Sequence, residues 1–119
     1  MVYEIALLPV HPEHTETFRR AFAKVLPLLS RAKGYRGHLL AQGIETPQVF
    51  NLIVRWESLE DHTPNFEASE DHRLFMMDLE EYLSEEPKVH HIEGAAFAIG
   101  ERGDLNSEVD IGNASNPLR

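Results

Sequence analysis

The feature that most constrains the fold is a set of short strands that are apolar on both faces. Residues 48–57 are predicted to form one strand, with large apolar side chains on one face and Val49 and Ile53 on the other. The first group is Phe50, Leu52, Val54 and Trp56. Residues 2–10 form a similar predicted strand, with Tyr3, Ile5 and Leu7 opposite Ala6 and Leu8. A sheet with one face in water alternates apolar and polar residues, so both faces of this sheet must be covered.

Four strands and two main helices are predicted in all. The strands are expected at residues 2–10, 37–45, 48–57 and 88–99. The first helix begins at His11-Pro12-Glu13, because proline and acidic residues favour a first helical turn. Its apolar stripe is Phe18, Phe22, Val25, Leu26 and Leu29, and Pro27 predicts a kink or a loosened last turn.

Two serines mark the remaining helix starts. Ser58, followed by Asp61, resembles a capping box and predicts a short helix that ends near Phe66. Ser69, followed by two acidic residues, predicts the second main helix. The order β-α-β-β-α-β indicates an α+β, ferredoxin-like antiparallel sheet. Right-handed connections place both main helices on one face of it.

The uncovered sheet face predicts a homodimer. Leaving a large apolar side chain in water costs about 1.5–3 kcal/mol, and a small domain is stable by only about 5–15 kcal/mol. A second copy of the same sheet, related by a two-fold axis, is the simplest cover.

Composition narrows the domain organisation and the partners. A length of 119 residues and an apolar fraction of 42% fit one domain, expected over residues 1–99. Residues 100–119 are polar and rich in Gly, Asn and Ser, and we expect a tail that packs on a partner subunit. The formal net charge of −9 disfavours nucleic acid and membrane surfaces as partners. The absence of cysteine favours a cytoplasmic location.

Several motifs, in this order, resemble the antibiotic biosynthesis monooxygenase family of the dimeric α/β barrel superfamily. They are Gly34-Tyr35-Arg36-Gly37-His38 at the entry to the second strand, Arg55-Trp56-Glu57-Ser58-Leu59 at the end of the third, Phe66-Glu67-Ala68-Ser69, and Pro87-Lys88-Val89-His90-His91. The resemblance covers residues 2–97 and is more specific for the fold than for the chemistry. The residues typical of its heme-degrading members are missing here, where the corresponding positions read Ala6-Leu7, Asn65 and Phe75-Met76.

The resemblance implies a cofactor-independent monooxygenase that acts on a small aromatic molecule, either a quinol or an anthrone-like compound. A histidine would remove a substrate proton, and the substrate anion would then reduce oxygen directly. The alternatives are a non-catalytic dimer that binds a small molecule, and a purely structural dimer. An inward-facing titratable group separates the first two, and a cavity excludes the third.

Two histidines are candidates for the base. His62 lies in the predicted short helix, where it acts as a general base or is an ordinary helix histidine. His72 lies near the start of the next helix, whose dipole favours a neutral imidazole, and the alternative is a solvated side chain. Asn65 takes the place of a histidine that many family members carry late in the short helix, and is a candidate for substrate binding.

The third strand supplies the remaining candidates for substrate binding. Trp56 either stacks on a flat substrate or is a core or dimer contact. Asn51 and Arg55 either donate hydrogen bonds to a substrate oxygen or pair at the interface. No metal or cofactor is expected. His11 and His14 lack an obvious third ligand, and His90 and His91 point to opposite faces of a strand.

Overall fold

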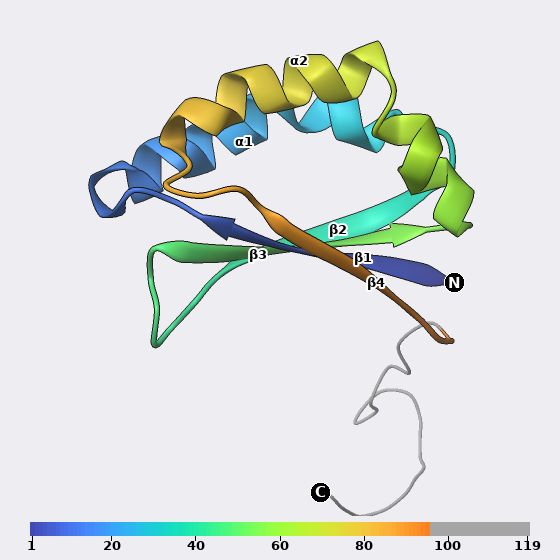
Figure 1. Cartoon of the computed structure of the whole chain (residues 1–119), viewed down its shortest axis with the longest axis horizontal. Helices are drawn as coiled ribbons and strands as arrows, with labels where there is room; N and C mark the ends of the chain where they lie inside the picture. The colour runs from blue at the N-terminus through green and yellow to red at the C-terminus, as the bar shows by residue number, and fades with distance from the viewer. Residues whose placement is uncertain (96–119) are drawn as a thin grey trace, which may run out of the picture.

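The computed structural model describes residues 1–95 and contains the predicted order of strands and main helices (Figure 1). The elements are β1 (Val2–Pro9), α1 (Thr15–Ser30), β2 (Tyr35–Gln42), β3 (Val49–Trp56), α2 (Glu70–Leu79) and β4 (Lys88–Glu93), with the short helical segments η1 (Pro12–His14), η2 (Asp61–Phe66) and η3 (Glu80–Tyr82). The predicted end of the last strand, 96–99, and the predicted tail, 100–119, lie outside the described residues. The domain boundary at residue 99 therefore stays a prediction.

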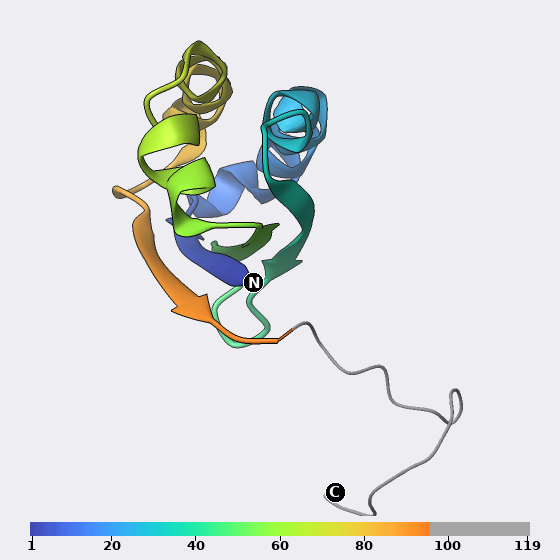
Figure 2. The same ribbon diagram turned by 90° about the vertical axis from the view of Figure 1, so that its right-hand side faces the viewer.

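The sheet has the strand order β2-β3-β1-β4, and every neighbouring pair is antiparallel. Both main helices lie side by side on one face, with β4 at the edge beside β1 (Figure 2). This is the ferredoxin-like α+β fold that the sequence predicts.

The core lies between the helices and the sheet, where the predicted stripes meet. Phe50, Leu52, Val54 and Trp56 of β3 are all buried on the helix-covered face. Phe18, Phe22, Val25 and Leu29 of α1 are buried against them. The 3.6-residue and 2-residue periodicities therefore identified the two sides of this core correctly.

The helix starts also follow the predicted caps. Ser69 precedes α2, and its Oγ accepts a hydrogen bond from the His72 backbone N–H at 3.1 Å. Ser58 Oγ accepts one from the Asp61 N–H at 3.2 Å, at the start of η2. The helix α1 continues through Pro27 to Ser30.

The opposite face of the sheet carries exposed apolar side chains. Leu39 pairs with Ile53, and Ile53 with Ile5, so these three side chains form one row across the sheet. Leu39 is 56% exposed and Ile92, in the neighbouring row, is 53% exposed. No helix within residues 1–95 is long and apolar enough to span a membrane.

Candidate active site

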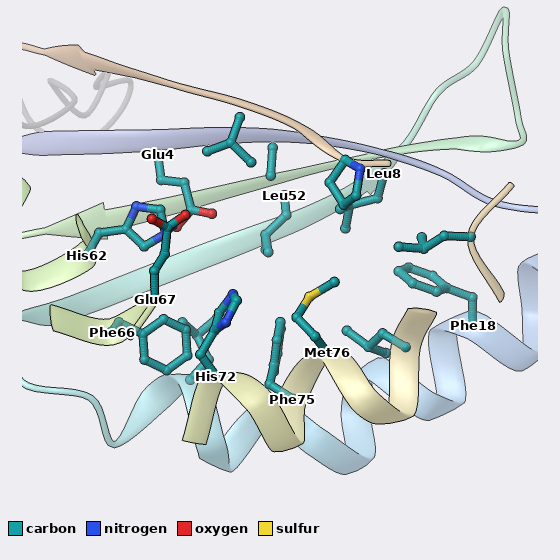
Figure 3. Close-up of a pocket in the computed structure, with 16 residues that line it drawn as sticks. Glu4, Leu8, Phe18, Leu52, His62, Phe66, Glu67, His72, Phe75 and Met76 are labelled. Carbon is teal, nitrogen blue, oxygen red and sulfur yellow. Dashed lines mark ion pairs between the residues drawn. The ribbon is translucent and has the colours of Figure 1, made fainter. Parts of the chain in front are cut away.

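A cavity of about 240 Å³ lies between the helices and the helix-covered face of the sheet (Figure 3). Its walls come from β1, α1, β3, η2, α2 and β4. The lining residues with titratable side chains are Glu4, His62, Glu67 and His72, and no lysine or arginine of residues 1–95 lines the cavity. Figure 3 shows Glu4, His62 and Glu67 at one end and Phe18 at the other, so the cavity has an acid–base end and an apolar end.

Glu4 is a carboxyl group in the core. It lies on β1 on the same side as Ala6 and Leu8, and only 7% of its surface is exposed. Its Oε1 accepts a hydrogen bond from the Trp56 indole N–H at 3.1 Å. Burial raises the pKa of Glu4 to about 7, against the smaller opposing effect of the Trp56 hydrogen bond. A carboxyl group with this pKa is divided between its acid and its base form near neutral pH.

His62, on η2, is buried beside Glu4. Its ring stacks on the Trp56 indole, with 5.3 Å between centroids and 21° between planes. His62 Nε2 lies 3.3 Å from Glu4 Oε1 and 3.8 Å from Glu67 Oε2. Burial is the main cause that lowers the pKa of His62 to about 4, so the imidazole is neutral at pH 7.

The second ring nitrogen of His62 is also engaged. His62 Nδ1 and His91 Nε2 lie 2.8 Å apart and share one hydrogen bond, whose direction depends on the tautomers. His91 is on β4, directly opposite Glu4 in the β1–β4 pairing. Three titratable side chains from three elements are therefore in contact in the order Glu4, His62, His91.

The chain next to His62 is held by a contact with a glycine. Asp61 is buried, and its carboxylate accepts hydrogen bonds from Ser58 Oγ at 3.0 Å and Lys33 Nζ at 3.3 Å. Gly34 has a φ of 85°, and a Cβ there would lie 2.2 Å from Asp61 Oδ2. Only glycine fits this backbone conformation and this approach, so Gly34 fixes where η2 begins and thereby where His62 lies.

His72 reaches the cavity from the first turn of α2. Its ring contacts Phe66 edge-on, with 5.3 Å between centroids, and burial lowers its pKa. A neutral His72 carries one N–H donor and one nitrogen acceptor next to the cavity. The structure thus brings the two predicted histidines, His62 and His72, to one cavity.

The other predicted site residues lie elsewhere. Trp56 is fully buried beneath His62 and does not line the cavity, so it contributes through its contacts with Glu4 and His62. Asn51 and Arg55 lie on the opposite face of the sheet, in register with Leu7 and Tyr3. Asn65 is exposed and outside the cavity wall, because η2 turns its side chain away from the core. A role for Asn51, Arg55 or Asn65 on a ligand in this cavity is not supported.

Three residues of the acid–base end were missed by sequence reasoning. Glu4 could have been predicted to face the core with Ala6 and Leu8, because alternate residues of a strand share a face. For His91 the signal was the same alternation with Val89, which lines the cavity, whereas His91 itself contacts His62. No sequence signal separates Glu67 from the many acidic residues of the surface.

The site's chemistry is that of proton transfer in an apolar space. Within residues 1–95, no set of three or more His, Asp or Glu side chains is arranged to hold a metal ion. The arrangement can take a proton from a ligand at the Glu4–His62 end and hold an apolar ring among Leu52, Phe66 and Phe75. These features define an α+β domain with a buried carboxyl–imidazole pair in a small-molecule cavity.

Comparison with known proteins identifies the family. The sequence model described as antibiotic biosynthesis monooxygenase matches residues 1–77, and the chain belongs to this family. It is 33% identical over 93 residues to the uncharacterised protein YczJ of Bacillus subtilis, covering 78% of this chain and 98% of that one.

Solved structures share the fold. A Bordetella bronchiseptica protein, provisionally named an antibiotic biosynthesis monooxygenase, superimposes with a TM-score of 0.76 and 34% identity, covering 79% of this chain and 96% of that one. SnoaB, a cofactor-independent oxygenase from Streptomyces nogalater, has a TM-score of 0.68 at 14% identity, with coverages of 81% and 94%. At 14% identity, the likeness to SnoaB shows the fold alone.

Proposed function

We propose that this protein is a cofactor-independent monooxygenase that deprotonates a small quinol-like aromatic in the cavity. The observation that carries the proposal is the buried Glu4–His62 pair at one end of a largely apolar cavity. Family membership and the naming of SnoaB as a cofactor-independent oxygenase add support from outside the site.

Glu4 is the better base of the pair. Its pKa of about 7 matches neutral conditions, whereas the pKa of His62, about 4, makes that imidazole a weak base. His62 Nε2 faces Glu4 and can hold or return the proton that Glu4 takes. His62 therefore acts together with Glu4, which refines the prediction that a histidine alone is the base.

The reaction balances without any further reductant. Glu4 removes a phenolic proton, and the electron-rich anion transfers one electron to oxygen. The resulting radical pair combines to a carbon–oxygen bond, and the peroxide takes the proton back. Removal of the ring C–H proton then cleaves the O–O bond and releases water. The substrate exchanges two hydrogens for one oxygen, and the N–H of neutral His72 is placed to stabilise the developing negative oxygen.

The cavity volume favours a quinol over an anthrone. A cavity of about 150 Å³ holds benzene. The 240 Å³ here matches one or two fused rings more closely than the three rings of an anthrone. The mostly apolar lining favours an aromatic ring, and the acidic groups Glu4 and Glu67 disfavour substrates that carry a carboxylate.

Two other roles, a purely structural dimer and a non-catalytic binding protein, receive less support. A purely structural dimer would fill the space between helices and sheet with side chains, and the cavity argues against it. A cavity with no inward-facing titratable group would support a non-catalytic binding protein, and Glu4 and His72, which line the cavity, argue against that reading.

Oxygen uptake tests the proposal. Benzene and naphthalene hydroquinones and an anthrone would be supplied to the wild type, Glu4→Gln and His62→Ala, with isotopically labelled oxygen. We expect one labelled oxygen in the product and a loss of roughly 100-fold or more in kcat for Glu4→Gln. Glu81→Gln is the matched control, because Glu81 is an exposed carboxylate outside the cavity. Equal rates for Glu4→Gln and Glu81→Gln, or no uptake by the wild type with any substrate, would refute the proposal.

We also infer that two copies pair through the open face of the sheet. A hollow of about 280 Å³ on that face is lined by Tyr3, Ile5, Ile53 and Ile92, among others. Arg55 Nε is buried on this face without a hydrogen-bond partner among the described residues, which a partner's oxygen can satisfy. Apolar area and an unpaired donor on one face favour a second copy of this sheet as the cover.

A further inference from the structure

We propose that His91 is the outer member of a proton relay that connects the Glu4–His62 pair to solvent. The inference deepens the proposed function, because it rests on the same pair, and it adds a residue on the edge strand β4. Such a relay would set how fast the buried pair recovers its protonation state.

Polar contacts between side chains connect Glu4, His62 and His91 in this order. Glu4 Oε1 lies 3.3 Å from His62 Nε2, and His62 Nδ1 lies 2.8 Å from His91 Nε2. An imidazole that engages both ring nitrogens can accept a proton at one and release a different proton from the other. His62 is placed to do this between a carboxyl group and a second imidazole.

Burial decreases along this chain of contacts, from Glu4 and His62 to His91. Glu4 and His62 are 7% and 2% exposed, whereas His91 is half-buried on β4. In the strand order β2-β3-β1-β4, β4 is the edge strand. His91 therefore offers the two buried groups a path to water that does not run through the cavity.

The protons balance when one proton passes from Glu4 through His62 to His91. When Glu4 is protonated, its O–H faces His62 Nε2, and His62 Nδ1–H donates to His91 Nε2. Transfer along the chain leaves Glu4 as a carboxylate, His62 with its proton on Nε2, and His91 as an imidazolium. His91 then releases its Nδ1 proton to water, and its remaining Nε2–H donates to His62 Nδ1. One proton leaves, and no group holds more protons than its chemistry allows.

The surrounding charges are compatible with this direction. Glu67, after η2, lies 3.8 Å from His62 Nε2 and favours a transient positive charge on that ring. His91 of β4 and His72 of α2 disfavour such a charge, and β3 contributes the uncharged indole of Trp56. His62 is thus faced by Glu4 of β1, Trp56 of β3, Glu67 after η2, His72 of α2 and His91 of β4.

A laser pH jump on the substrate-free protein tests the relay. Infrared absorption of the protonated Glu4 carbonyl follows the proton, and its loss in Glu4→Gln assigns the band. Emission of Trp56, the single tryptophan, reports the same event because its indole contacts both Glu4 and His62.

His91→Gln is the main variant, because the amide can keep a hydrogen bond to His62 but cannot carry a proton. We expect protonation of Glu4 to slow by about 100-fold, the scale of a positioned proton-transfer group, and free imidazole in the buffer to restore the rate. His90→Gln is the matched control, because His90 is the preceding residue and pairs with Ile5 on the open face. This variant must relax at the wild-type rate.

A wild-type rate in His91→Gln, or a slowing that imidazole does not relieve, would overturn the relay. If His91→Gln does not fold, His62→Gln interrupts the same path one step further in, and a wild-type rate there has the same meaning. Because no substrate is present, an inactive oxygenase leaves this result unaffected. An active oxygenase with a fast His91→Gln would reject the relay alone.

Discussion

Replacing Glu4 and His62 one at a time by glutamine is expected to give two opposite dependences of stability on pH. The pKa of Glu4 is raised from its ordinary 4.5 to about 7, and that of His62 is lowered from 6.5 to about 4. Between about pH 4.5 and 6.5, the folded pair holds one proton on Glu4 and the unfolded pair holds one on His62. The two contributions therefore cancel in the wild type across this window.

Glu4→Gln leaves the contribution of His62 alone. A group whose pKa is depressed on folding contributes stability that is complete above pH 6.5 and is lost as the pH falls through about 4. A pKa difference of this size corresponds to about 3 kcal/mol. The variant should therefore gain about 3 kcal/mol of unfolding free energy between pH 4 and 6.5.

His62→Gln leaves the contribution of Glu4, whose pKa is raised on folding. That contribution is complete below pH 4.5 and is lost as the pH rises through about 7, again by about 3 kcal/mol. This variant should be most stable in acid and weakest above neutrality, the reverse of Glu4→Gln.

Urea unfolding followed by circular dichroism, at a series of pH values and one fixed protein concentration, measures both slopes. Glu81→Gln should follow the wild type, since Glu81 is exposed. The reasoning fails if the two variants show slopes of the same sign, or if both match the wild type.

Three further results are expected. Gly34→Ala should lose at least about 1 kcal/mol more unfolding free energy than Gly37→Ala in urea unfolding. Both glycines have positive φ, but only a methyl group at position 34 would meet Asp61, and equal losses would contradict this. Ile53→Lys should convert the dimer to monomers in size-exclusion chromatography with light scattering, while Met77→Lys, at an exposed position of α2, should not; a monomeric wild type would argue against the pairing. Ser69→Ala should cost about 1 kcal/mol of unfolding free energy through loss of the α2 cap, and an unchanged midpoint would show that the cap contributes little.

The fold was predictable because local patterns carry it. A few residues are enough to show which side of an element is buried, as in the apolar stripe of α1 and the alternation of β3. Ser69 likewise marks where α2 begins. Right-handed connections then leave few ways to arrange four strands and two helices. The ends of the first three strands differ from the predicted ones by at most three residues, because turn residues and strand residues are alike in composition there.

The acid–base end was only partly predictable. His62 and His72 follow from the chemistry of histidine, but Glu4 is a carboxyl residue in a chain with 20 acidic residues. Its burial depends on the pairing of β1 with β3 and β4, which sets Trp56 and His91 beside it and is not a local property. Asn51 and Arg55 lie on the same face of β3 as Ile53, because alternate residues of a strand share a face. The sequence alternation does not show which of the two sheet faces lines the cavity.

The two ends of the cavity are built largely by different parts of the chain, and this has a consequence for redesign and divergence. Glu4 and His62 come from β1 and η2, whereas Phe18, at the far end, comes from α1 (Figure 3). Phe18 packs on Phe22 and Phe50, at the opposite end of the cavity from Glu4 and His62 (Figure 3). A side chain of another size at this position would therefore change the length of molecule that the cavity accepts while the acid–base end is retained.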